Sequence, residues 1–226
     1  MRSLASALLL CVAIAATAAA QTGSAPPPAL LQAVSATTAA SADYAFDFEL
    51  SSGERQWRAR FDPSATPRLR LTSPAPQSLN NDERQAFERM AARMEGVPWC
   101  ASERMSQAAN VRLIAENTET ATYAFQPTAE MIRSEQARPF ASRFRGEFTI
   151  VKADADISRF RIFLPRAFSP APLVTIERFD VRVSCAAAPN GRQYAAETIS
   201  DVRGSAFGSA INEQSVQRAH NLNAAP

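Results

Sequence analysis

A two-residue alternation of apolar and polar side chains recurs along this chain and constrains its fold more than any other feature. In residues 44–50 every second side chain is large and aromatic or aliphatic, and the rhythm returns in 57–61, 148–150 and 159–162. Successive side chains of a β-strand point to opposite faces, so this pattern is typical of half-buried strands. With the other short apolar runs bounded by turn residues, the chain predicts about nine or ten antiparallel strands.

Helical periodicity is confined to two segments. Residues 29–40 predict a short helix, and a longer one is expected from Asp82 onward, after Asn80 or Asn81 as its cap. One face of the longer helix is apolar, and its end is marked by glycine and proline: Phe87, Met90, Ala91 and Met94, then Gly96 and Pro98. Together the elements predict an α+β fold, a large antiparallel sheet covered by one to three helices.

The first twenty residues have the organisation of a secretory signal peptide. Arg2 precedes an apolar run over 4–15, and three alanines at 18–20 form a small-residue cleavage site before Gln21. We therefore expect a cleaved leader over 1–20 and a periplasmic mature protein.

The rest of the chain predicts one domain with short polar ends. Cys11 offers an alternative leader with a lipid-modified cysteine, but it follows leucine and lies inside the apolar run. Residues 21–28 predict a flexible tether, 29–218 a single domain and 219–226 a disordered tail. No later segment approaches the roughly 20 apolar residues of a spanning helix, so no integral membrane span is expected in the mature chain.

Charge balance argues against nucleic acid as a partner. Cleavage would remove one of the 24 basic residues, Arg2, and leave 23 against 22 acidic ones. A nucleic-acid-binding surface needs a marked excess of basic side chains, which this composition does not supply.

Two cysteines remain after the predicted cleavage, Cys100 and Cys185. A pair in an oxidising compartment is most simply a disulfide, with free buried thiols as the alternative. A bridge across 85 positions would stabilise the fold by about 4–5 kcal/mol on the chain-entropy model. A metal site would need further ligands, and the only histidine is His220, far away in the sequence.

No catalytic constellation is predicted. A hydrolytic triad would depend on His220, which lies in the polar C-terminal segment. Asp154 and Asp156 are the closest acidic pair, and turn formation explains them without acid–base chemistry. Residues 204–208 have the glycines of a phosphate loop but no lysine, which favours a bend in a late strand. We expect a protein without catalytic residues, metal or cofactor.

The aromatic side chains are expected to share one face of the sheet, opposite a row of arginines. The arginines are Arg58, Arg60, Arg159, Arg161, Arg178 and Arg182. In an ordinary sheet the aromatics fill the core, and the arginines pair with Asp47, Glu49, Glu147 and Glu177. The alternative is a concave apolar face that shelters a ligand, formed by Phe46, Phe48, Trp57, Phe61, Phe125, Phe148 and Phe160.

The order of these elements resembles the periplasmic outer-membrane lipoprotein carrier (LolA-like) superfamily. A short helix leads into Tyr44-Ala-Phe-Asp-Phe-Glu-Leu50, then comes the hairpin segment Trp57-Arg-Ala-Arg-Phe-Asp-Pro63. A polar helix follows, then Phe144-Arg-Gly-Glu-Phe-Thr-Ile-Val151, Ile157-Ser-Arg-Phe-Arg-Ile-Phe-Leu164 and a terminal meander, so that the likeness spans 29–218. The resemblance implies an open half-barrel, a curved antiparallel sheet around a helix-covered apolar cavity.

Two functions follow as expectations. The first is noncatalytic binding of a lipid or a lipidated protein in the concave cavity, which the resemblance implies by analogy of fold alone. The second is a structural or interaction module of the cell envelope that contacts a protein partner through its arginine-bearing surface.

Overall fold

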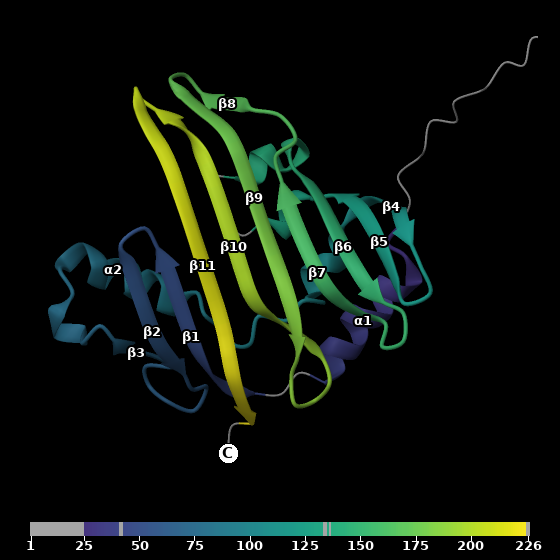
Figure 1. The fold of residues 1–226 in the computed structure, drawn as a ribbon, viewed down its shortest axis with the longest axis horizontal. Helices are drawn as coiled ribbons and strands as arrows, with labels where there is room; N and C mark the ends of the chain where they lie inside the picture. The colour runs from purple at the N-terminus through teal and green to yellow at the C-terminus, as the bar shows by residue number, and fades with distance from the viewer. Residues whose placement is uncertain (1–24, 41–42, 133–134, 136, 225–226) are drawn as a thin grey trace, which may run out of the picture.

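The computed structural model describes residues 25–40, 43–132, 135 and 137–224, and a single antiparallel sheet dominates it (Figure 1). The strands are β1 (Tyr44–Ser52), β2 (Arg55–Phe61), β3 (Leu69–Ser73), β4 (Ala109–Glu116), β5 (Thr120–Gln126), β6 (Arg145–Val151), β7 (Asp156–Phe163), β8 (Phe168–Ala171), β9 (Val174–Ala187), β10 (Gln193–Ala206) and β11 (Ser209–Ala224). The helices are α1 (Pro28–Ala39) and α2 (Asn81–Ala92), with 3-10 turns η1 (Pro76–Ser78), η2 (Glu103–Gln107), η3 (Ala129–Met131) and η4 (Arg138–Arg143). The predicted α+β class is confirmed.

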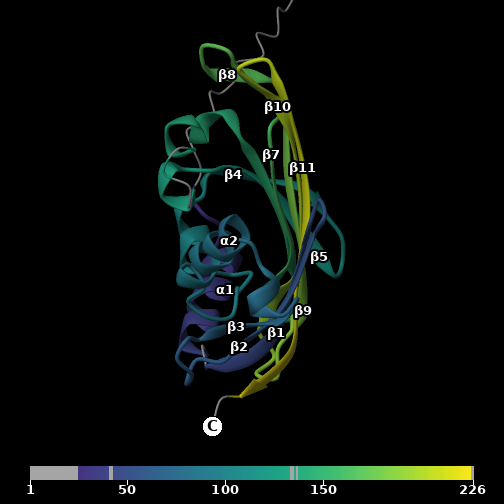
Figure 2. The same cartoon turned by 90° about the vertical axis from the view of Figure 1, so that its left-hand side faces the viewer.

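The sheet is open, and its first strand lies beside its last. The order across it is β3-β2-β1-β11-β10-β9-β7-β6-β5-β4, and β8 pairs only with β9. The sheet curves, and both α-helices lie on one side of it (Figure 2). We call this helix-covered side the inner face and the opposite side the outer face.

The C-terminal segment departs from the prediction. Instead of a disordered tail over 219–226, β11 continues through Ala224 because its end pairs with β1, where Ala219 lies opposite Phe48 and Ala224 opposite Tyr44. The sequence here lacks a clear apolar rhythm, so only its neighbours reveal the strand. Of the predicted tether, 21–24 and the leader before it lie outside the described residues, while Pro28 begins α1.

The predicted capping of α2 is confirmed. The Asn80 side chain accepts a hydrogen bond from the Glu83 N–H at 2.9 Å, and the Glu83 carboxylate accepts one from the Asn80 N–H at 3.0 Å. This reciprocal capping box satisfies two backbone donors that a helix start would otherwise leave free. It fixes where α2 begins.

The apolar inner face divides into two clusters. Cluster 1 lies under α1 and includes Leu30 and Ala33 of α1 together with Phe125, Phe148 and Ile157 of the sheet. Cluster 2 lies at the α2 end of the sheet, and its buried members are Phe46, Phe48, Ala59, Phe61, Leu69, Ala188, Tyr194 and Ala219. The two clusters share one sheet but are covered by different helices.

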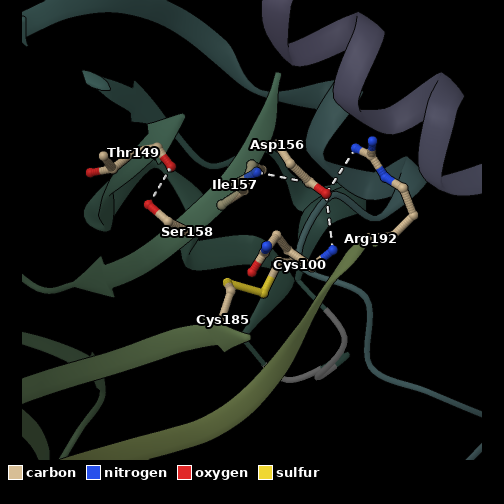
Figure 3. The surroundings of a disulfide bond; sticks show 8 residues. Cys100, Thr149, Asp156, Ile157, Ser158, Cys185 and Arg192 are labelled. Carbon is tan, nitrogen blue, oxygen red and sulfur yellow. Dashed lines mark hydrogen bonds and ion pairs between the residues drawn. A yellow bond between two sulfur atoms is a disulfide. The ribbon is translucent and has the colours of Figure 1, made fainter. Parts of the chain in front are cut away.

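The predicted disulfide between Cys100 and Cys185 is present (Figure 3). It joins the segment that follows α2 to β9, and the Cys100 N–H also donates to the Gln193 carbonyl at 3.0 Å. Trp99 forms an isolated bridge with Tyr194 of β10. The chain after α2 is therefore fastened to the middle of the sheet.

Asp156 is a buried structural residue beside the disulfide (Figure 3). Its carboxylate accepts hydrogen bonds from the N–H groups of Ile157 at 2.8 Å and Gln193 at 2.9 Å, and lies 2.8 Å from the Arg192 guanidinium. Burial raises the pKa of Asp156 above its usual value, although these partners and Arg192 act to lower it. Of the pair Asp154 and Asp156, Asp156 therefore has a structural role, in which its carboxylate connects the start of β7 to the start of β10.

Candidate functional site

The seven aromatic residues predicted to form a ligand face lie on the inner face but in two separate places. Phe46, Phe48 and Phe61 belong to cluster 2, and Trp57 lies beside them, edge-on to Phe87 of α2 with the ring centres 5.6 Å apart. The other three, Phe125, Phe148 and Phe160, belong to or pack against cluster 1. The structure therefore does not bring all seven around one cavity.

The cluster 1 aromatics are packed by their own neighbours. The Phe125 ring lies 5.7 Å from Phe148 and 5.9 Å from Phe160, between centres. A Cβ at Gly146 would overlap the Phe125 ring, so glycine is required there to admit it. Leu30 and Ala33 of α1 close this cluster and have no exposed surface. Cluster 1 is a filled core.

Cluster 2 leaves a hollow between the sheet and α2, which we call the α2 pocket. Its volume is about 440 Å³, within the range of small-molecule sites. The floor is formed by Phe46 and Phe48 of β1, Ala195 and Thr198 of β10, and Gln217, Arg218 and Ala219 of β11. The roof is Ala86, Arg89, Met90, Arg93, Met94, Glu95, Gly96, Val97 and Pro98.

The α2 pocket combines an apolar patch of wall with polar floor residues and a charged rim. Met90, Met94 and Val97 face the two phenylalanines of β1, and methionine side chains adapt to ligands of different shape. Arg89 of α2 and Arg93 directly after it are exposed at the edge of the hollow, and Glu95 is the one acidic side chain beside them. Arginine forms bidentate hydrogen bonds with carboxylate and phosphate groups, so the rim suits the head of an anionic amphiphile.

Helix α2 covers the pocket without being buried itself. None of its residues is buried, whereas Leu30, Ala33, Val34 and Thr37 of α1 are. Phe87, Met90 and Ala91 of α2 pack only partly against cluster 2. A roof with so little buried surface costs less free energy to displace than a core helix.

The outer face is a network of ion pairs. Of the six arginines predicted there, five lie within 4 Å of a carboxylate: Arg58 with Glu49, Arg60 with Asp47, Arg161 and Arg182 with Asp180, and Arg178 with Asp180 and Asp201. The partners Asp47 and Glu49 were predicted, but for these arginines Asp180 and Asp201 replace the expected Glu147 and Glu177. Alternation explains the role of Asp180, because it lies two residues from both Arg178 and Arg182 and shares their face of β9, whereas Glu177 does not.

Asp180 is the centre of that network. Arg161 donates to both carboxylate oxygens at 2.9 Å, and Arg182 donates to one of them at 2.7 Å. The hydrogen bond from Arg161, with help from Arg182, lowers the pKa of Asp180 below its usual value against the effect of burial. A wide polar hollow of about 1230 Å³ adjoins this network near the β1–β2 turn. The acidic and basic side chains that line this hollow largely neutralise one another.

Groups that could perform chemistry are dispersed. Among the described residues no three His, Cys, Asp or Glu side chains lie close enough together to hold a metal ion. His220 lies on β11 with Nε2 3.6 Å from the Glu49 carboxylate, in the ion-pair network. No helix in the described part of the chain is long and apolar enough to cross a membrane.

Sequence reasoning found the methionine face of α2 but not the floor opposite it. Ala195, Thr198 and Gln217 are small or polar residues without a recognisable motif. They meet Phe46 and Phe48 only because β1 pairs with β11, a contact between the two ends of the domain. The one available signal in the sequence is the pair Met90 and Met94 on the apolar side of the predicted helix, which ends at Ala92 in the structure.

Comparison of the chain with protein-family models, with curated proteins and with solved structures gives no match in any of the three.

Proposed function

We propose that the protein binds an apolar ligand, a lipid or the acyl chain of a lipidated protein, noncovalently in the α2 pocket. The observation that carries the proposal is a hollow of about 440 Å³ between an aromatic sheet face and a helix with no buried residue. Removing one acyl chain from water needs only apolar surface, at roughly 25 cal/mol per Å². No catalytic group is required.

The charged rim would orient the bound ligand, with its polar head at the edge of the pocket. An acyl chain would lie against Phe46 and Phe48, while Arg89 and Arg93 at the edge would receive a carboxylate or phosphate head. Helix α2 has no buried residue, and a Cβ at Gly96 would meet no neighbour, so the roof has room to move outward when a ligand enters. The disulfide at Cys100 holds the chain just beyond that point.

The proposal is tested by filling the pocket. Thr198→Phe places a ring in the hollow from a half-exposed strand position, and we expect the affinity for a fluorescent fatty acid to fall at least tenfold, about 1.4 kcal/mol. Thr198→Val is the matched control, because it keeps the volume of threonine and should bind like the wild type. Equal affinity of Thr198→Phe and the wild type would contradict the proposal, as would a purified protein with no bound lipid by mass spectrometry and no affinity for the probe.

The envelope interaction module remains the second proposal. Its surface is less suited to a partner than expected, since five of the six arginines are engaged by the chain's own carboxylates. Crosslinking in intact cells that captures a protein through Arg159 or its neighbours, with no lipid bound, would favour it.

A further inference from the structure

The far ends of two neighbouring hairpins carry the two most exposed large apolar side chains among the described residues. Leu173, between β8 and β9, is 75 % exposed, and Phe207, between β10 and β11, is 78 % exposed. The Phe207 N–H donates to the Leu173 carbonyl at 2.9 Å, so the two turns are joined. We call this joined end the hairpin tip. It lies where β9, β10 and β11 extend past the shorter strands (Figures 1 and 2).

Both side chains occupy backbone positions that favour other residues. Phe207 has φ of 51° and Gly208 of 82°, the geometry of a two-residue hairpin turn in which Asn-Gly is strongly preferred. Leu173 has φ of 62° after Pro172, a turn position that favours glycine or asparagine. The chain thus places bulky apolar groups where they neither relax the backbone nor fill the core. A residue that folding does not explain is a candidate for function.

The hairpin tip is also free of charge. No charged residue occurs in 167–176 or in 204–212. The residues that bound these stretches are two arginines and two glutamates, Arg166, Arg203, Glu177 and Glu213. The flanking charges therefore cancel, and electrostatic attraction is not what the tip offers.

The convex shape and small size of the tip identify the partner. A specific protein–protein contact buries more than about 1,000 Å² in total, far beyond what one leucine and one phenylalanine supply. A lipid bilayer accepts such side chains singly, because it closes around an apolar wedge of any shape. We propose that the hairpin tip inserts Leu173 and Phe207 into the surface of a lipid bilayer and so holds the protein there reversibly.

This attachment is separate from the α2 pocket. Thr198 in the pocket floor and Ala206 beside the tip are eight residues apart on β10, about 26 Å along the strand. Docking by the tip therefore leaves the pocket accessible, and neither proposal depends on the other.

The test uses substitutions that improve the turns while removing the apolar groups. Phe207→Asn creates Asn-Gly, and Leu173→Asn places asparagine after Pro172, so both should keep or raise the melting temperature. In flotation with phosphatidylcholine vesicles, we expect the wild type to rise with the vesicles. Each single variant should have a partition coefficient into the vesicles about tenfold lower, and the double variant should remain in the vesicle-free fraction. Leu113→Asn, on the edge strand β4 and 47 % exposed, is the matched control and should float like the wild type.

Several results would overturn the proposal. These are a wild type that does not float, a double variant that floats equally, or a Leu113→Asn variant that loses binding as fully as the double variant. Binding that requires phosphatidylglycerol and disappears in high salt would show electrostatic adsorption instead. A dimer in sedimentation velocity that only the double variant abolishes would assign the tip to a second copy of the chain.

Discussion

The two halves of the inner face are built from the same alternating aromatic pattern but are closed in opposite ways. Over cluster 1, α1 inserts Leu30 and Ala33 completely, and the result is a filled core. Over cluster 2, α2 contributes only half-buried side chains, and a pocket remains. The comparison teaches that an aromatic strand face does not decide between core and binding site. The depth to which the covering helix enters decides it.

The largest expected effect tests how firmly the segment that follows α2 is anchored in cluster 1, where Cys100 and Cys185 both lie. Replacing both Cys100 and Cys185 with alanine opens a crosslink across 85 positions, and we expect the free energy of unfolding to fall by about 4–5 kcal/mol. Urea unfolding measures this, and the reduced wild type should behave like the double variant. A loss below about 1 kcal/mol would show that the disulfide does not anchor the segment that follows α2.

A paired substitution tests the difference in packing directly. Phe148→Ala in cluster 1 should lower the free energy of unfolding by about 3–5 kcal/mol, because Phe148 is 1 % exposed and its ring would be replaced by a cavity. Met90→Ala in α2 should cost only about 1 kcal/mol, since that side chain already borders open space. If urea unfolding gave equal losses of unfolding free energy for the two variants, cluster 1 and cluster 2 would not differ in packing as described.

Asp156 tests the polar anchor of the filled half. Asp156→Ala leaves the buried Arg192 guanidinium and two backbone N–H groups without their acceptor, and we expect a loss of about 3 kcal/mol. Asp154→Ala, in the exposed turn two residues earlier, should change stability by less than about 0.5 kcal/mol. Similar values for both variants in urea unfolding would mean that the anchor contributes nothing.

The smallest effect is a pH dependence of the outer face. The folded pKa of Asp180 is lowered, so its stabilising contribution is complete above the unfolded value of 3.8 and disappears as the pH falls through the folded value. Asp180→Asn should therefore lose stability at neutral pH and approach the wild type in strong acid, measured by thermal melts across the acid range. Glu54→Gln, in the exposed β1–β2 turn, serves as control. A gap between Asp180→Asn and wild type that does not narrow with acid would contradict the assignment.

Local sequence patterns predicted most of the individual helices and strands. They could not predict which distant strands pair with one another. The alternation in 44–50, the capping by Asn80 and the pairing of Cys100 with Cys185 were all readable, because each depends on a few neighbouring residues or on a count. The strand at 219–224 was missed, since small and polar residues form it only when β1 offers its edge.

The candidate site was predicted in part for the same reason. Phe46 and Phe48 were named as ligand-facing and line the α2 pocket, whereas Phe125 and Phe148 were named on the same grounds and are buried in cluster 1. Periodicity reveals which face of a strand is apolar but not what covers it. The sequence does not single out the hairpin tip, because turns are ordinarily polar and the glycines of 204–208 predict only a bend.

The neighbourhood of β1 and β11 has a consequence for the timing of folding. The first hairpin of the domain, β1 with β2, joins the rest of the sheet only through a strand that ends at Ala224. A ribosome that has released everything up to β10 has therefore produced a sheet in two unconnected pieces. The two pieces can join only when β11 is available to pair with both β1 and β10, and contacts of such long sequence separation make that step slow.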